Sequence, residues 1–179
     1  CPGEEGGSGK TFMVREGVFD DVDAALTWHP QAFNAIFSTP TLANIQAYFR
    51  FKGTSAHAAN SPHLGRSALD AVELMNVGAN YLREHVVPDA RFHYSITRTG
   101  GASPNVVQAE AEALYLMRAR RMNDVQAIFE RIQKIAEGAA LITGATLEVE
   151  PYYPFYENVL PNGVLAENFR ANAEAVGMR

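Results

Sequence analysis

The chain has 179 residues, of which 47% are hydrophobic and 20% are charged, so it can bury a sizeable core in one or two domains. Its formal net charge of −5 argues against nucleic acids and anionic membranes as partners, because both attract clustered Lys and Arg. The one cysteine, Cys1, excludes an intramolecular disulfide, and no apolar run reaches the roughly 18 residues of a membrane span. We therefore expect a cytoplasmic protein with no nucleic-acid and no membrane partner.

The first 40 residues have the character of a segment of a larger protein. The sequence starts on CPGEEGGSGK without an initiating Met and stops on ANAEAVGMR within a helical pattern, so a fragment is expected. Apolar residues at 24–26 lead into TWHP, which predicts the end of a strand at His29. Asn, Ser and Thr between Pro30 and Pro40 predict a linker.

Residues 41–153 combine strand and helix periodicities. Strict alternation over 44–51 predicts a strand with one buried and one solvated face, and an apolar stripe from Leu69 to Val86 predicts a helix capped by Ser67. The remaining patterns predict strands at 92–97 and roughly 105–118, a helix from Asn123 to Gly144, a strand at 147–149 and a final helix in 164–176. The order β-α-β-β-α-β predicts an α+β, ferredoxin-like domain with an antiparallel four-stranded sheet and two helices on one face.

The opening loop contains two adjacent carboxylates, Glu4 and Glu5. GSGKT is similar to a phosphate-binding loop, but that motif requires Gly where Glu4 stands. Adjacent acids would repel a phosphate, whereas they suit a divalent cation with a proton shuttle. The alternative is a solvated acidic turn.

Three further polar residues stand at the ends of predicted strands or in turns. His29 suits a metal ligand or a capped surface side chain. His57 is flanked by small residues in GTSAHAA, which lets a ligand approach, but it is equally consistent with an exposed loop histidine. Asn105 in GGASPN can bind a ligand or satisfy its own backbone.

In combination these motifs are similar to those of the aminoacylase and carboxypeptidase family of co-catalytic zinc exopeptidases, in its amidohydrolase branch. GEEGGSGK, TWHP, GTSAHAANSPHLGRSALDA, TGGASPNVV and LMRAR occur in the family's order along nearly the whole chain. The resemblance implies a ferredoxin-like lid and dimerisation domain at 41–155, flanked by incomplete parts of an α/β catalytic domain at 1–40 and 156–179.

The resemblance also implies a role for each candidate residue. Glu4 matches the general base, while Glu5 and His29 match ligands of a site for two divalent ions, zinc or manganese. His57 matches a lid histidine that stabilises the oxyanion in a neighbouring subunit. Asn105 and Arg118 match positions that hold the substrate's carboxylate, and Arg118 is equally consistent with a surface charge at a strand edge.

Departures from the family pattern qualify these roles. The family commonly has Asn-Val-Ile-Pro-Asp where this chain continues from Asn105 with Val-Val-Gln-Ala, which affects the turn that orients Asn105. The family's other His and Asp ligands have no counterpart in these residues. We therefore expect the chain by itself to be metal-free and inactive.

Three functions compete on this basis. The first is a metal-dependent amidohydrolase that cleaves an acyl-amino acid or aroyl-amino acid, with p-aminobenzoyl-glutamate as the expected substrate and an A subunit as a possible partner. The second is a module whose role is homodimerisation, through the stripe from Leu69 to Val86 and an unpaired strand near 107–117. The third, RNA binding, fits the topology but not the acidic charge.

Overall fold

The computed structural model describes residues 9–178, apart from the side chains of residues 153 and 154. Contacts within the chain divide it into two compact units. One is Pro40–Leu160, and the other joins the segment that ends at Thr39 to the segment that begins at Pro161. Each unit is described separately below.

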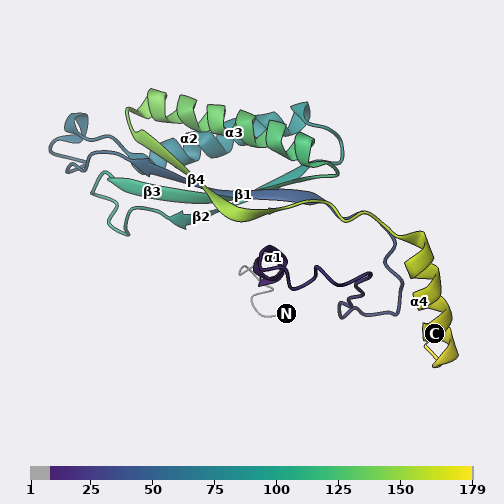
Figure 1. The fold of residues 1–179 in the computed structure, drawn as a ribbon. Helices are drawn as coiled ribbons and strands as arrows, with labels where there is room; N and C mark the ends of the chain where they lie inside the picture. Colours follow the sequence, from purple (N-terminus) through teal and green to yellow (C-terminus); the bar gives the residue numbers. More distant parts are fainter. Residues whose placement is uncertain (1–8, 179) are drawn as a thin grey trace. The chain divides into compact units, whose positions relative to one another are not determined.

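The larger unit is a four-stranded antiparallel sheet with the strand order β2-β3-β1-β4. The strands are β1 (Ala43–Lys52), β2 (Arg91–Arg98), β3 (Glu110–Ala119) and β4 (Thr146–Tyr156). Helices α2 (Ala68–Leu82) and α3 (Met122–Thr143) cover one face of the sheet (Figure 1). The predicted ferredoxin-like fold is confirmed.

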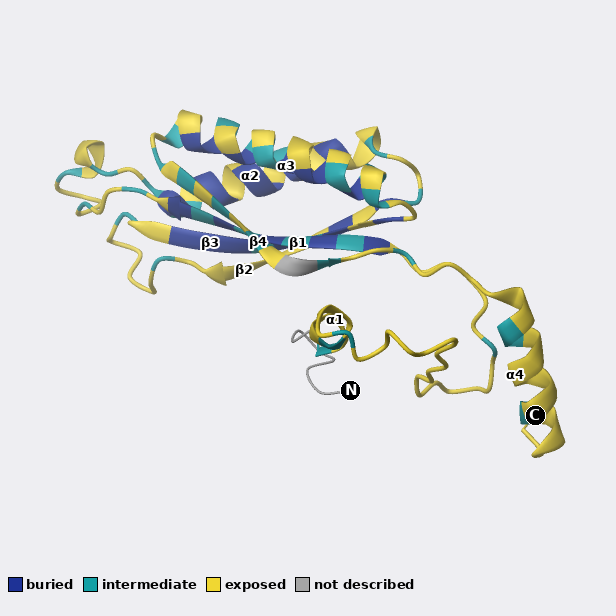
Figure 2. Ribbon diagram, viewed as in Figure 1, coloured by how far each residue is buried: buried dark blue, intermediate teal, exposed yellow. Residues whose placement is uncertain are grey.

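The core lies between the sheet and the two helices (Figure 2). In β1, residues Ala43 to Phe51 alternate between fully buried and half-buried positions, as a period of two requires. Phe49 packs edge-to-face on Tyr115 of β3, with ring centroids 5.4 Å apart. The opposite face of β1 is half-buried rather than fully solvated, because its side chains pair with those of β3 and β4.

The predicted start of α2 and the predicted end of α3 are confirmed, whereas α2 ends at Leu82 instead of near Val86 and α3 begins at Met122, before Asn123. The Ser67 side chain accepts a hydrogen bond from the backbone N–H of Asp70, which caps α2. Single turns of 3₁₀-helix, η1 (Pro62–Leu64) and η2 (Arg83–His85), flank this helix. Gly144 follows α3 with φ of 71°, a left-handed conformation that favours glycine and ends the helix.

Two predicted strands differ from the structure. β3 begins at Glu110, not at 105, because residues 105–109 bond to the loop that follows β1 instead of continuing the pairing with β2. Residues 24–29 form no strand: this segment has no paired strand within residues 9–178, so His29 lies in irregular chain.

The two ends of the sheet differ in what they carry. At the loop end, Lys52 pairs with Glu110 and Thr146, and residues 53–67 and 99–109 leave the sheet there. At the linker end, Ala43 pairs with Ala119, and the chain passes into the smaller unit before β1 and after β4. Glu110 and Arg118 are eight steps apart along β3, which is about 27 Å at 3.4 Å per residue.

The smaller unit contains α1 (Gly9–Arg15) and α4 (Gly163–Ala175). The Asn162 side chain caps α4 by accepting a hydrogen bond from the backbone N–H of Leu165. Between α1 and the larger unit, residues 23–39 form no regular element.

Candidate functional site

The loops at residues 53–67 and 99–109 are joined by backbone hydrogen bonds at the loop end of the sheet. Thr54 and Arg66 exchange two N–H···O bonds of 2.8 and 2.9 Å, and the N–H of Gly53 donates to Ala109 at 2.7 Å. A Cβ atom on Gly53 would lie 1.9 Å from the Arg66 carbonyl oxygen, so only glycine allows this approach. The two loops therefore form one structure, which we call the double loop.

His57 and Asn105 lie together in the double loop. The Ala58 N–H donates to the Asn105 carbonyl at 2.9 Å, and His57 forms a β-bridge with Val106. His57 is exposed, and its ring Nδ1 accepts hydrogen bonds from the backbone N–H groups of Ala59 and Asn60, each 3.2 Å long. The structure thus brings together two of the residues that the sequence singled out.

Gln108 is a residue of this region that sequence reasoning missed. The Ser67 hydroxyl donates to its side-chain oxygen at 3.2 Å, and its carbonyl accepts from the N–H of Ala68 at 2.9 Å. Gln108 therefore ties the turn after Asn105 to the start of α2, at the position of the proline in the family motif given above. The signal was present as the departure from the family motif, but its contacts depend on long-range closure.

Arg118 does not lie near His57 and Asn105. It is exposed on β3, opposite Asn44 of β1 and Arg91 of β2, close to the linker end. The two ends of β3 are too far apart for Arg118 and the double loop of the same chain to bind one small molecule.

His29 lies in the smaller unit with an exposed side chain. Its Nδ1 lies 3.0 Å from the carbonyl oxygen of Pro30 and 3.5 Å from the side-chain nitrogen of Gln31, so the first contact requires a proton on Nδ1 and the second a lone pair there. A neutral histidine can ligate a metal through either ring nitrogen. Glu4 and Glu5, the predicted base and second ligand, lie outside the described residues. Within residues 9–178, no three His, Cys, Asp or Glu side chains form a metal-binding group.

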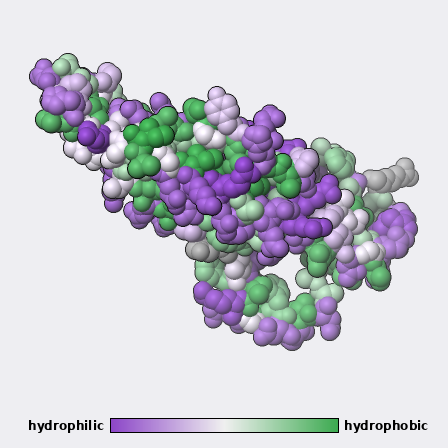
Figure 3. All heavy atoms as spheres, turned by 90° about the horizontal axis from the view of Figure 1, so that it is seen from above, coloured by the Kyte–Doolittle hydropathy of each residue, from purple (hydrophilic) through white to green (hydrophobic). Residues whose placement is uncertain are grey.

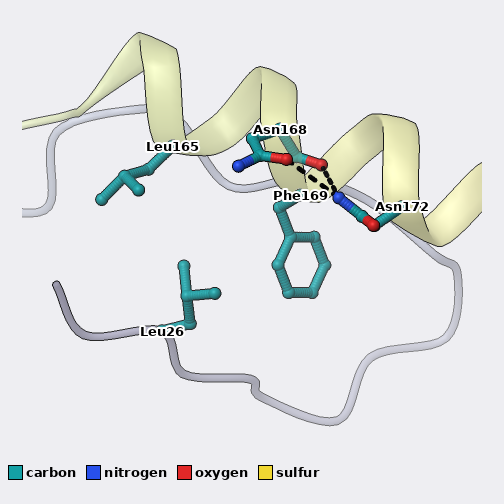
Figure 4. A pocket seen from close by; sticks show the side chains of 5 residues that line it. All are labelled: Leu26, Leu165, Asn168, Phe169 and Asn172. Carbon is teal, nitrogen blue, oxygen red and sulfur yellow. Dashed lines mark hydrogen bonds between the residues drawn. The ribbon is translucent and has the colours of Figure 1, made fainter.

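A hollow of about 280 Å³ lies in the smaller unit between α4 and the segment around Leu26 (Figure 4). Its lining consists of Leu26, Leu165, Asn168, Phe169 and Asn172. Asn172 Nδ2 donates to both the backbone carbonyl and the side-chain oxygen of Asn168. The lining contains no titratable group, so the hollow offers apolar contact and amides but no acid or base.

A charged cluster lies on the sheet face that the helices leave open. Arg50 Nε donates to Glu112 at 2.5 Å, Arg50 also pairs with Glu150, and the Thr97 hydroxyl donates to Glu112 at 2.7 Å. Burial tends to raise the pKa of Glu112, but the hydrogen bonds from Thr97 and Arg50 outweigh it and hold that pKa below its usual value. We assign this cluster to cross-strand stabilisation.

Apolar side chains are exposed on α2 and on the neighbouring edge strand β2. Leu74, Val77 and Tyr81 follow one another at steps of three and four along α2, on a face that does not contact the core. Tyr94 and Ile96 are exposed on β2. Figure 3 shows hydrophobic side chains gathered among hydrophilic ones over the helical layer. Within the described range, no helix is both long and apolar enough to span a membrane.

Comparisons with known proteins agree with this fold. The model of the peptidase dimerisation domain (M20_dimer) matches residues 41–143. The B subunit of the p-aminobenzoyl-glutamate hydrolase of Escherichia coli is 68% identical over 165 residues, which are 92% of this chain and 34% of that protein. The Xaa-Arg dipeptidase of Mus musculus is 33% identical over 99% of this chain and 41% of its own length.

A solved structure gives the same result. The crystal structure of the aminobenzoyl-glutamate utilization protein from Klebsiella pneumoniae superposes with a TM-score of 0.64 and 25% identity, over 92% of this chain and 42% of that chain. This chain thus spans less than half the length of these relatives, and the two curated ones bear the names of hydrolases. The chain belongs to the M20 peptidase family, whose dimerisation domain it contains.

Proposed function

We propose that the chain forms part of a metal-dependent amidohydrolase that cleaves p-aminobenzoyl-glutamate into p-aminobenzoate and glutamate. The support is the 68% identity to a hydrolase named for this substrate, together with the motifs along the chain that resemble those of the family. The chain covers 34% of that relative, so the activity is proposed for the longer protein.

We also propose that the active site is shared between two chains, and the observation that carries this part of the proposal is the separation of His57 from Arg118 along the sheet. The double loop with His57 and Asn105 lies at one end, whereas Arg118 lies at the other, where the chain enters the smaller unit. One active site can use all three residues only if they come from two chains. His57 and Asn105 of one lid then complete a site to which a second chain contributes Arg118.

The matched dimerisation domain supports the required pairing of two lids, and the exposed surface supplies a place for it. β3 is an interior strand and the stripe from Leu69 to Val86 faces the core, so neither forms the interface expected from the sequence. The alternative interface consists of the edge strand β2 and the exposed face of α2 that carries Leu74, Val77 and Tyr81. Among the described strands, β2 has β3 as its one neighbour. Arg83 joins these elements by donating to the Phe92 carbonyl at 2.6 Å.

We take the chemistry of the site from the resemblance of its motifs to those of the family. Glu4 takes a proton from the attacking water and delivers it to the leaving amine, while Asn105 and Arg118 hold the substrate's carboxylate. His57 donates a hydrogen bond to the oxygen that becomes negatively charged. Glu5 and His29 would hold the zinc or manganese ions, which when bound would lower the pKa of a water molecule.

Gel filtration with light scattering tests the pairing on the chain itself. We expect a dimer, and we expect Val77→Glu and Ile96→Lys to convert it to a monomer. Leu141→Lys provides the matched control, because Leu141 is 85% exposed on α3, outside the proposed interface. A monomeric wild-type chain, or a dimer that Leu141→Lys disrupts equally, would contradict the proposed interface.

A second candidate, a dimerisation module without catalysis, is favoured by the family match alone. The release of p-aminobenzoate by the full-length protein distinguishes the two. Hydrolysis that His57→Ala reduces supports the enzyme, and its absence in the presence of zinc or manganese supports the module. Because the relative with 68% identity is the B subunit of a hydrolase, the assay is repeated with an A subunit added.

A further inference from the structure

The ring of His57 is held by its own turn. The backbone N–H groups of Ala59 and Asn60 both point at Nδ1, at 3.2 Å, and the Ser61 N–H donates to the His57 carbonyl at 3.0 Å. The side chain therefore caps the turn at residues 57–61, as Asn and Asp side chains commonly do.

These contacts determine where the ring proton is. A backbone N–H can only donate, so Nδ1 must present a lone pair to both groups. A ring protonated at Nδ1, whether neutral or cationic, would place N–H groups against N–H groups. The neutral ring with its proton on Nε2 is the one form that satisfies both contacts.

We infer that His57 acts as a neutral imidazole that donates a hydrogen bond through Nε2–H, and that the amides of Ala59 and Asn60 hold it in this form. This inference rests on the proposed function of His57. It adds that His57 does not act as a proton-transfer group, because the lone pair of Nδ1 is occupied by the two amides and the proton on Nε2 is the one that it offers in the hydrogen bond. A fixed donor of this kind stabilises a developing oxyanion without reorganisation, and proton transfer falls to Glu4.

The turn is itself anchored, so the ring direction is fixed with respect to the double loop. The Ala58 N–H donates to the Asn105 carbonyl, and the Val107 N–H donates to the Ala56 carbonyl at 2.9 Å. Ala58 and Ala59 have side chains too small to shield the ring. The Nε2 edge is accordingly the part of His57 that remains available to a substrate or a second chain.

Nitrogen NMR on the chain labelled with ¹⁵N-histidine tests the inference without an activity assay. At neutral pH we expect the His57 ring to show a protonated Nε2 and a fully unprotonated, hydrogen-bonded Nδ1, with His57→Gln identifying the signals. His93, exposed on β2, is the matched control and should show the averaged shifts of a histidine in water. A His57 ring that is averaged like His93, or protonated at Nδ1, would overturn the inference.

Two substitutions in the full-length hydrolase give a second readout. His57→Gln places an amide N–H near the position of Nε2. His57→Asn keeps an acceptor near the position of Nδ1, but its side chain is too short to place a donor where Nε2 lies. We expect His57→Gln to retain at least about tenfold more kcat than His57→Asn, and the reverse order would contradict the Nε2 donor. If the NMR result holds but both variants hydrolyse at the wild-type rate, the tautomer stands and the proposed catalytic role of His57 fails.

Discussion

Tyr115 of β3 donates a hydrogen bond to the side-chain oxygen of Asn76 on α2, with an O···O distance of 2.6 Å. Tyr115 is fully buried and Asn76 is 6% exposed. Tyr94 of the edge strand stacks on the Tyr115 ring, with centroids 5.1 Å apart. A polar contact at the centre of the core therefore connects the helix to the sheet beside the proposed interface.

Asn76→Ala should lower the free energy of unfolding by about 2 kcal/mol, because it leaves the buried Tyr115 hydroxyl without an acceptor and opens a small cavity. Asn80→Ala, one turn later on the exposed face of α2, is the matched control and should cost less than about 0.5 kcal/mol. Urea unfolding followed by circular dichroism measures both. Equal effects of the two substitutions would show that the buried hydrogen bond contributes nothing.

Stability should fall at alkaline pH because of Tyr115. Burial raises the pKa of this tyrosine above its usual value near 10, with Tyr94 adding to the shift and Arg83 opposing it. Above pH 10 the unfolded chain therefore loses this proton while the folded chain keeps it, and the stabilisation declines as pH rises. Relative to Tyr115→Phe, the wild type should lose about 1.3 kcal/mol between pH 9 and pH 11. An advantage over Tyr115→Phe that is constant across this range would rule out the mechanism.

Arg50 and Lys52 provide a matched pair on the open face of the sheet. Arg50→Met leaves the buried Glu112 carboxylate with Thr97 as its remaining side-chain donor, and should cost about 1–3 kcal/mol of stability. Lys52→Met removes an exposed pair with Glu148, 3.7 Å long, and should cost less than about 0.5 kcal/mol. Thermal unfolding measures the loss of stability in both variants. A smaller loss for Arg50→Met than for Lys52→Met would contradict the assignment of this cluster to cross-strand stabilisation.

Gly53 and Gly138 should respond in opposite directions to substitution by alanine. At Gly53 the new methyl group would collide with the Arg66 carbonyl oxygen, so the double loop must shift and its backbone bonds weaken. At Gly138, within α3, the methyl group meets no atom within 4 Å, and alanine should stabilise the helix by about 0.5–1 kcal/mol. Limited proteolysis should cut Gly53→Ala within residues 53–67 faster than wild type. An unchanged rate of cleavage within residues 53–67 would show that the double loop does not need the close approach of Gly53 to the Arg66 carbonyl oxygen.

The fold was predictable where each segment carries its own periodicity. Ile45 to Phe51 alternate and the α2 and α3 stripes repeat every three or four residues, so the elements and their order could be inferred locally. The start of β3 could not be inferred in this way. Val106 and Val107 have the residue types of a strand, but the Val107 N–H donates to the carbonyl of Ala56, 51 residues earlier. Strand order likewise depends on pairings such as Arg50 with Glu112, 62 residues apart.

The sequence was enough to predict which residues belong to the candidate site, but not where these residues lie relative to one another in the fold. The motifs that carry His57, Asn105 and Arg118 can be recognised in the sequence. That the first two share one loop structure and the third lies at the opposite end of the sheet follows from the strand register, which no local pattern encodes. The same limitation explains why Gln108 and the amides around His57 were not identified as parts of the site.

Mixing two inactive variants tests the central claim most directly. In the full-length hydrolase, His57→Ala and Arg118→Ala should each abolish most p-aminobenzoyl-glutamate hydrolysis. If one lid supplies His57 to a site that uses Arg118 of the other chain, each mixed dimer contains one intact site. Random exchange of equal amounts should then restore about a quarter of the wild-type activity, since half of the dimers are mixed and half of their sites are complete. No recovery, although light scattering shows that the subunits have exchanged, would contradict a site shared between two chains.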